Sequence, residues 1–205
     1  FSDSEFVIID DSSRRNLEIT WNLKDGTTQF TLLETILNTQ TAMGSRLLRN
    51  RLMYPLTDVE KIKNRQNRIL SFTKEKPLLD QVRSILSNIL DIERLSGRIA
   101  MERAHAKDLQ ALRQSLESVV KARAIVEQLG LVEGIELETA LSIVFDINNA
   151  ILDDPSTSLT EGRLIKDGYS AELDRVRELQ NNFNQILEDY LEEEKDKTGI
   201  PNLKI

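Results

Sequence analysis

Residues that break helices and strands are scarce in this sequence, which has eight glycines and four prolines in 205 residues. Long uninterrupted elements are therefore favoured over short strands joined by turns. Aromatic residues make up only 5% of the chain, and the mostly aliphatic apolar set suits the packing of helices on one another. The sequence predicts an all-α, multi-helix bundle. One β-branched apolar run, over 5–10, favours a short N-terminal strand or an extended segment.

Caps and breakers predict where the helices begin and end. Thr31 with Glu34, and Thr57 with Glu60, have capping-box spacing, and Pro55 stops the helix before it. Helices are predicted to start near residues 31 and 57 and to span about 42–53, 77–90, 92–103, 107–129, 135–152 and 170–197. Four side chains of the helix that starts near residue 57 are expected to face inward: Val59, Ile62, Ile69 and Leu70.

The last predicted helix, over 170–197, carries an apolar stripe with the spacing of a coiled-coil seam. The stripe consists of Leu173, Val176, Leu179, Phe183, Ile186 and Tyr190. An unbroken helix over this range would be roughly 42 Å long. We expect this helix either to project from the bundle or to pair with another helix.

Composition and charge exclude several classes of protein. The absence of cysteine rules out disulfides and thiolate metal sites, and no apolar run approaches the roughly 20 residues of a membrane-spanning helix. A cytoplasmic protein is expected, and a chain that starts at Phe1 is expected to be a piece of a longer one. The net charge is −7, although 41–70 holds seven basic and two acidic residues, so this chain is not expected to be a main DNA grip.

The sequence shows no motif that points to catalysis. His105 is the only histidine and precedes a predicted helix, where an exposed structural role is favoured over a catalytic one. Neither a Gly-Lys phosphate loop nor a Gly-x-Gly-x-x-Gly motif is present. We therefore expect no catalytic, cofactor-binding or metal-binding residue, and no enzyme activity, within these 205 residues.

Five sequence blocks occur in an informative order. They are S-R-R-N-L-E-I-T (13–20), T-A-M-G-S-R-L-L-R-N-R-L-M-Y-P-L (41–56), D-I-E-R-L-S-G-R-I-A (91–100), G-Y-S-A-E-L-D-R-V-R (168–177) and T-G-I-P-N-L-K-I (198–205). In content, order and spacing they closely resemble the core domain of the MutS family of DNA mismatch-repair proteins. One departure is Ala106-Lys107-Asp108, where the family often has Pro-Arg-Asp, and lysine does not replace a forked guanidinium.

The resemblance implies an architecture and a mechanical function. Residues 1–12 would enter from a preceding domain, 13–169 would form the helical core or lever domain, and 170–205 would begin a long helix that rises toward a DNA clamp. The lever would couple an ATPase to that clamp. ATP, magnesium, mismatched double-stranded DNA and a second MutS protomer would belong to the full-length parent, and the fragment alone would not bind DNA tightly.

The resembling blocks also supply candidate structural residues. Gly44 would permit close helix approach or a first-turn geometry that a side chain would block, and Pro55 would set the turn between two helices. Arg14, Arg15 and Arg46 would contribute interdomain or buried ion pairs, or else lie on the surface.

Three further candidates lie three and four residues apart on one predicted helix face: Asp91, Arg94 and Arg98. A salt-bridge ladder that anchors the core is favoured over a ligand site at these positions. The alternative function for the whole chain is a helical scaffold that pairs with a partner through the stripe from Leu173 to Tyr190.

Overall fold

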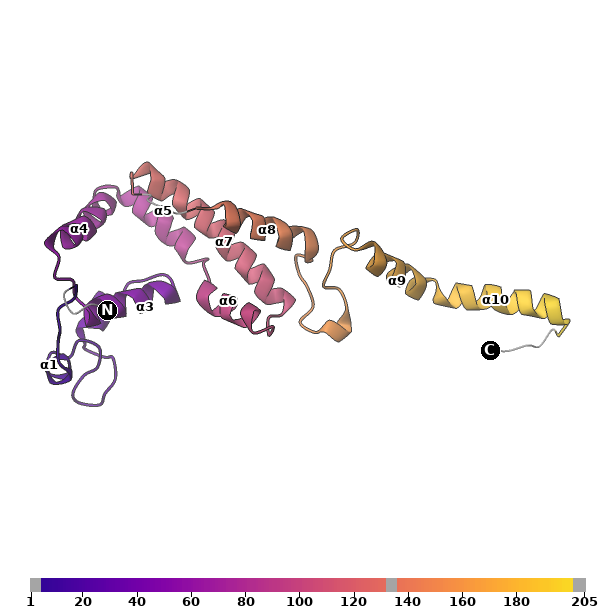
Figure 1. Ribbon diagram of the computed structural model, residues 1–205, viewed down its shortest axis with the longest axis horizontal. Helices are drawn as coiled ribbons and strands as arrows, with labels where there is room; N and C mark the ends of the chain where they lie inside the picture. The colour runs from indigo at the N-terminus through magenta and orange to yellow at the C-terminus, as the bar shows by residue number, and fades with distance from the viewer. Residues whose placement is uncertain (1–4, 132–135, 201–205) are drawn as a thin grey trace.

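The structure is a computed structural model that describes residues 5–131 and 136–200. It is an elongated, all-α molecule in which α1–α3 lie at one end, α5–α8 form the central bundle, and α9 and α10 project as an arm (Figure 1). The helices are α1 (Asp11–Asn16), α2 (Leu32–Ile36), α3 (Ala42–Met53), α4 (Val59–Lys74), α5 (Lys76–Leu86), α6 (Ile92–Ala100), α7 (Ala106–Gln128), α8 (Glu138–Ala150), α9 (Ala171–Asn181) and α10 (Phe183–Thr198), with a 3-10 turn at Leu159–Glu161. The predicted all-α fold is confirmed.

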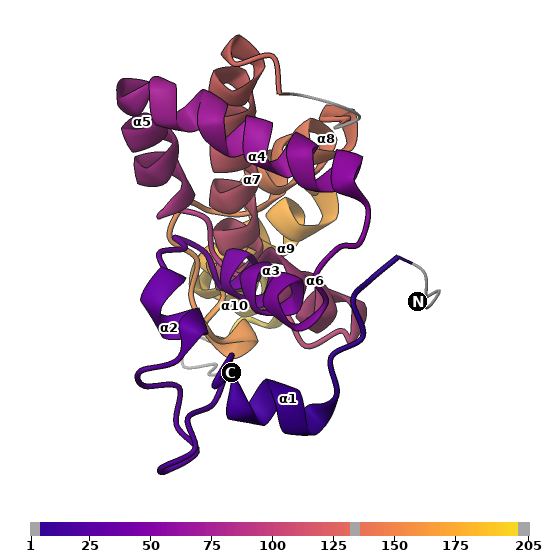
Figure 2. The same cartoon turned by 90° about the vertical axis from the view of Figure 1, so that its left-hand side faces the viewer.

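Helix α7 is the centre of the bundle and packs against α5, α6 and α8 (Figures 1 and 2). The core cluster lies where α6, α7 and α8 meet the segment after α8, and consists of Leu95, Leu112, Ile147 and Ile151. Its aliphatic side chains supply the apolar burial that holds the bundle together.

Of the two predicted helix caps, the one at α2 is confirmed and the one at α4 is wrong, and α3 has a cap that the spacing did not predict. Thr31 and Thr41 cap α2 and α3 by accepting the backbone N–H groups of Glu34 and Gly44, respectively. Helix α4, however, is capped by Asp58 rather than Thr57, because Asp58 Oδ1 accepts the N–H groups of both Glu60 and Lys61. A carboxylate also interacts favourably with the positive end of the helix dipole.

Of the two alternatives predicted for 5–10, a short strand or an extended segment, the strand is absent, since the described residues contain none. The N-terminal segment makes a single antiparallel bridge, between Phe6 and Leu56. Two backbone hydrogen bonds flank it, from Val7 N–H to Pro55 O at 2.8 Å and from Thr57 N–H to Glu5 O at 3.1 Å. The partner segment is only a short turn between α3 and α4, so the ladder has no room to extend.

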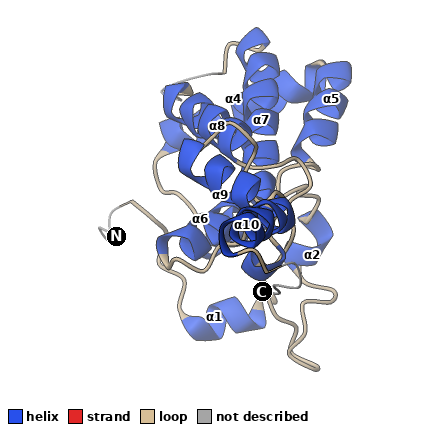
Figure 3. Cartoon of the chain, turned by 90° about the vertical axis from the view of Figure 1, so that its right-hand side faces the viewer, coloured by secondary structure: helices blue, strands red, loops and turns tan. Residues whose placement is uncertain are grey.

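The prediction of one long C-terminal helix is also wrong, because Asn182 interrupts it between α9 and α10. The backbone of Asn182 has φ −94° and ψ 2°, outside the helical range, and asparagine favours such local turns. Figure 3 looks along the resulting arm, with α10 toward the viewer. All but the first residue of the apolar stripe on this arm are exposed: Val176, Leu179, Phe183, Ile186 and Tyr190.

The inward orientation predicted for α4 is wrong at three of its four positions. Val59, Ile69 and Leu70 are 59%, 63% and 50% exposed, respectively, and only Ile62 is half-buried. Helix α4 contacts mainly α5, which follows it directly in the chain, so one side of its amphipathic surface has no cover among the described residues.

Candidate interdomain junction

A forked ion pair joins α3 to the start of α6. The two terminal nitrogens of Arg46 donate to Asp91 Oδ2 and Oδ1 at 2.8 and 2.7 Å, and one of them also donates to Glu93 Oε2 at 2.6 Å. Bidentate guanidinium–carboxylate pairs are stronger and more directional than single contacts. This contact fixes the N-terminal part of the molecule to the central bundle.

Asp91 has a second task as the N-cap of α6, where its Oδ1 accepts the backbone N–H of Arg94 at 3.3 Å. Hydrogen bonds from Arg46, followed by that cap bond and the charges of Arg46 and Arg94, lower the pKa of Asp91 to about 2 from its ordinary 3.8, against some opposing desolvation. The same contacts with Asp91 and Glu93 raise the pKa of Arg46. The carboxylate is thus held ionised through the physiological range.

The Asp91 contribution to stability is expected to vanish in acid. Since the folded-state pKa lies below the ordinary value of 3.8, the stabilisation is complete above about pH 4 and is lost as the pH falls toward 2. The melting temperature of the wild type should exceed that of Asp91→Asn at pH 6, and the gap should shrink between pH 4 and 2. Thermal melts across this range measure it, with the exposed Asp154→Asn as control. A gap that stays constant down to pH 2 would contradict the ion-pair account.

The other end of α6 is joined to α7 by Arg98. Its guanidinium donates to Asp108 Oδ1 at 2.8 Å, while Asp108 Oδ2 accepts the backbone N–H of His105 at 2.8 Å. His105 is the residue before α7, so Asp108 both closes the first turn of that helix and receives the arginine. Ion pairs from α6 therefore reach other helices at both ends, whereas the Arg94 side chain is exposed.

The remaining predicted residues surround the ends of α1 and α3. Gly44 donates its N–H to Thr41 Oγ1, and a Cβ at Gly44 would lie 3.0 Å from that oxygen, so a side chain would crowd the cap. Pro55 accepts the N–H of Val7, which attaches the N-terminal segment to the turn after α3.

Arg14 and Arg15 lie together on α1 beside a cavity of about 410 Å³. The Arg14 guanidinium lies 5.5 Å from the centre of the Tyr54 ring and pairs with Asp11 at 3.6 Å. Arg15 is exposed. Of the predicted residues, the structure thus brings Arg46 and Asp91 into contact, whereas Arg14 and Arg15 lie elsewhere, on α1.

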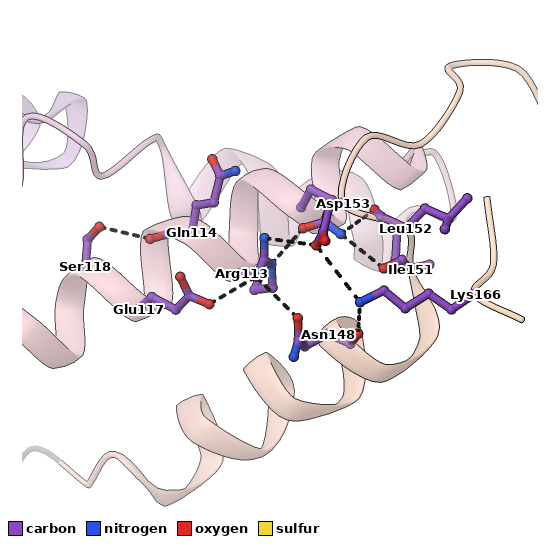
Figure 4. A network of polar contacts seen from close by, with 10 residues as sticks. Arg113, Gln114, Glu117, Ser118, Asn148, Ile151, Leu152, Asp153 and Lys166 are labelled. Carbon is purple, nitrogen blue, oxygen red and sulfur yellow. Dashed lines mark hydrogen bonds and ion pairs between the residues drawn. The ribbon is translucent and has the colours of Figure 1, made fainter. Parts of the chain in front are cut away.

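Sequence reasoning missed Arg113 of α7, whose side chain contacts four polar residues (Figure 4). Its Nε donates to Gln110 at 2.7 Å, one terminal nitrogen reaches Glu117 at 3.2 Å and Asn148 of α8 at 3.4 Å, and the other lies 3.8 Å from Asp153. The side chain of Arg113 is only 16% exposed. Polar residues at 110, 113 and 117 on one face of an apolar helix were the available signal.

This cluster also fixes the segment that leads to the arm. Gln110 Nε2 donates to the carbonyl of Leu152 at 2.6 Å, and Lys166 Nζ donates to the carbonyl of Asn148 at 2.7 Å. Arg177 of α9 then pairs with Asp167 at 2.6 Å and donates to the carbonyl of Ile165 at 3.0 Å. The start of the arm is therefore attached by polar contacts to the segment that Arg113 holds.

The described residues contain neither a metal-binding cluster nor a membrane-spanning helix. No group of three or more His, Cys, Asp or Glu side chains within 5–131 and 136–200 could hold a metal ion. Over the same residues, no helix combines the length and apolar character needed to cross a membrane.

The fold and these contacts define an elongated all-α module in which ion pairs join α3 to the start of α6 and α6 to α7, and attach α7 and α9 to the segment between α8 and α9. The family model described as MutS domain III matches residues 12–196. The DNA mismatch repair protein MutS of Treponema denticola is 43% identical over 209 residues, which cover 100% of this chain and 24% of that protein. The Methanosarcina mazei protein of the same name is 39% identical over 216 residues, with 100% and 24% covered. The chain belongs to the MutS family, as its domain III, and spans about a quarter of the length of these curated relatives.

Proposed function

We propose that this chain is the mechanical lever of a DNA mismatch repair protein. In this role it performs no chemistry and transmits movement between a nucleotide-hydrolysing part and a DNA-holding part of a longer polypeptide. ATP and magnesium act in the first of these parts. Mismatched double-stranded DNA and a second protomer are the partners of the whole protein, in the cytoplasm.

One observation carries the proposal: polar contacts between elements follow one another along the length of the molecule. The series runs from Arg46–Asp91 through Arg98–Asp108 to Arg113–Asp153 and Arg177–Asp167. Directional ion pairs between helices resist sliding better than apolar contacts alone, because they fix register as well as distance. A displacement at α3 would therefore be carried to α9 rather than absorbed between the helices.

The proposal predicts that the chain alone binds DNA poorly. Its net charge is −7, so the phosphate attraction that dominates DNA affinity is weak. Titration of a fluorescent mismatched duplex with this chain at about 150 mM salt should give a dissociation constant no tighter than about 10⁻⁵ M. Fluorescence anisotropy measures it, with the perfectly paired duplex as control. Sub-micromolar binding that prefers the mismatch would contradict a purely mechanical role.

A helical interaction module is the second candidate, because five residues of the arm's apolar stripe are about half exposed. If the stripe pairs with a second copy, sedimentation velocity at about 100 µM should show dimers, and Leu179→Asp should abolish them by placing a charge in the seam. The exposed Glu178→Ala is the matched control. A monomer at this concentration, for both the wild type and the variant, would count against self-pairing through the arm.

A further inference from the structure

A groove lies between the N-terminal segment, α3 and α4, outside the junctions described above. Its volume is about 650 Å³, and we call it the Arg51 groove. Its basic lining consists of Arg51, Lys61, Arg65 and Arg68. Its apolar lining consists of Phe6, Leu48, Leu56, Ile69 and Phe72. Among the described residues, Glu5 is the only acidic one in the lining.

Among the described residues that line the groove, basic side chains outnumber acidic ones. Glu5 is occupied by Lys61, whose ammonium it contacts directly. Within the part of the chain that the structure describes, neither Arg51 nor Arg65 makes a side-chain hydrogen bond or an ion pair. Desolvation, followed by repulsion from Arg65 and Arg68, lowers the pKa of Arg51. An anion placed between these guanidinium groups would relieve the repulsion.

The groove also offers apolar surface. Ile69, which lines it from α4, is 63% exposed. A ligand that contacts both the basic and the apolar lining of the groove must therefore carry apolar side chains beside its negative charges. A nucleic-acid phosphate backbone supplies the charge but not the apolar contact, whereas an acidic amphipathic peptide supplies both.

We propose that the Arg51 groove binds a carboxylate-bearing, partly apolar segment of the same polypeptide, from the three quarters of the MutS length that this chain does not span. In this arrangement, one or more Asp or Glu side chains pair with Arg51 and Arg65, and apolar residues cover Ile69. The inference rests on the proposed function in assuming that longer polypeptide. The groove would then be the contact through which another domain pushes on α3 and α4.

The test uses overlapping, fluorescein-labelled 20-residue peptides that tile the Treponema denticola MutS protein outside the matched stretch. Anisotropy titrations against this chain should find at least one acidic peptide with a dissociation constant on the order of 10 µM. Arg51→Glu/Arg65→Glu should weaken that peptide at least about tenfold, since it replaces attraction by repulsion. The charge-matched control is Arg103→Glu/Arg175→Glu, at two exposed positions. If charge reversal impairs folding, the milder double variant Arg51→Gln/Arg65→Gln is titrated with the same peptide instead.

The outcomes separate the possible occupants. Binding of an acidic peptide that only the groove variants weaken supports the proposal. Absence of any binding peptide, or equal binding to the groove and control variants, overturns it. Competition by a 20-base-pair DNA duplex that depends on Arg51 and Arg65 would identify a nucleic-acid site instead, and self-association lost in the groove variants would identify a second copy. The lever function is tested separately, by ATP-driven release of the full-length protein from DNA. A negative peptide result would therefore overturn the groove proposal without overturning the proposed function.

Discussion

Replacement of Arg113 by methionine is expected to lower the free energy of unfolding by about 2 kcal/mol. Methionine keeps the apolar stem that packs between α7 and α8 but removes every donor. The buried amide of Gln110 loses its 2.7 Å partner, and Asn148 loses its link to α7. Hydrogen bonds that involve a charged group each contribute about 1.5–3 kcal/mol, and the solvent-exposed Asp153 recovers part of the loss through water.

Urea unfolding followed by circular dichroism measures this effect, with Lys121→Met as the control. Lys121 lies on the same helix and is exposed, so its replacement should change stability by less than about 0.5 kcal/mol. Equal stability of the two variants would mean that the Arg113 contacts do not join α7 to α8. The segment from Ile151 to Lys166 should also exchange its amide hydrogens faster in Arg113→Met, because its anchor at Gln110 is loosened.

Local signals determine one helix almost completely. Helix α3 occupies the predicted range, because the Thr41 hydroxyl caps its first turn and Pro55 prevents its continuation, and both effects act within a few residues. The cap of α4 shows the limit of the same reasoning. Thr57 and Asp58 are both good capping residues, and sequence spacing favoured the wrong one.

Long-range partners could not be predicted in this way. Arg46 and Asp91 were each chosen as candidates, yet their pairing depends on how two helices 45 residues apart pack. The local signal at 110, 113 and 117 could mark Arg113 but not its link to α8, because its partner Asn148 lies 35 residues away. The part that the chosen residues play between domains stays a prediction.

The prediction of one unbroken helix in the arm was wrong for a different reason. Its apolar stripe continues with helical spacing across Asn182, so periodicity alone cannot reveal that the backbone leaves the helix there. The orientation of α4 was also mispredicted from periodicity, because an amphipathic pattern predicts that one helix face is covered but not which element covers it. That element can lie outside the described residues.

The central claim is that movement travels through this chain, and a proline in the arm should interrupt it. Leu179 is 52% exposed and lies inside α9, so Leu179→Pro removes a helical hydrogen bond and clashes with the preceding turn at a cost of about 3 kcal/mol, without opening the core. Leu179→Ala keeps the helix and is the control.

The most direct measurement is the rate at which ATP releases a full-length MutS protein, carrying this sequence as its domain III, from a fluorescent mismatched duplex. The account predicts that Leu179→Pro keeps ATP hydrolysis and mismatch binding but slows release at least about tenfold, whereas Leu179→Ala stays close to wild type. Release by Leu179→Pro at the wild-type rate would contradict transmission through the arm.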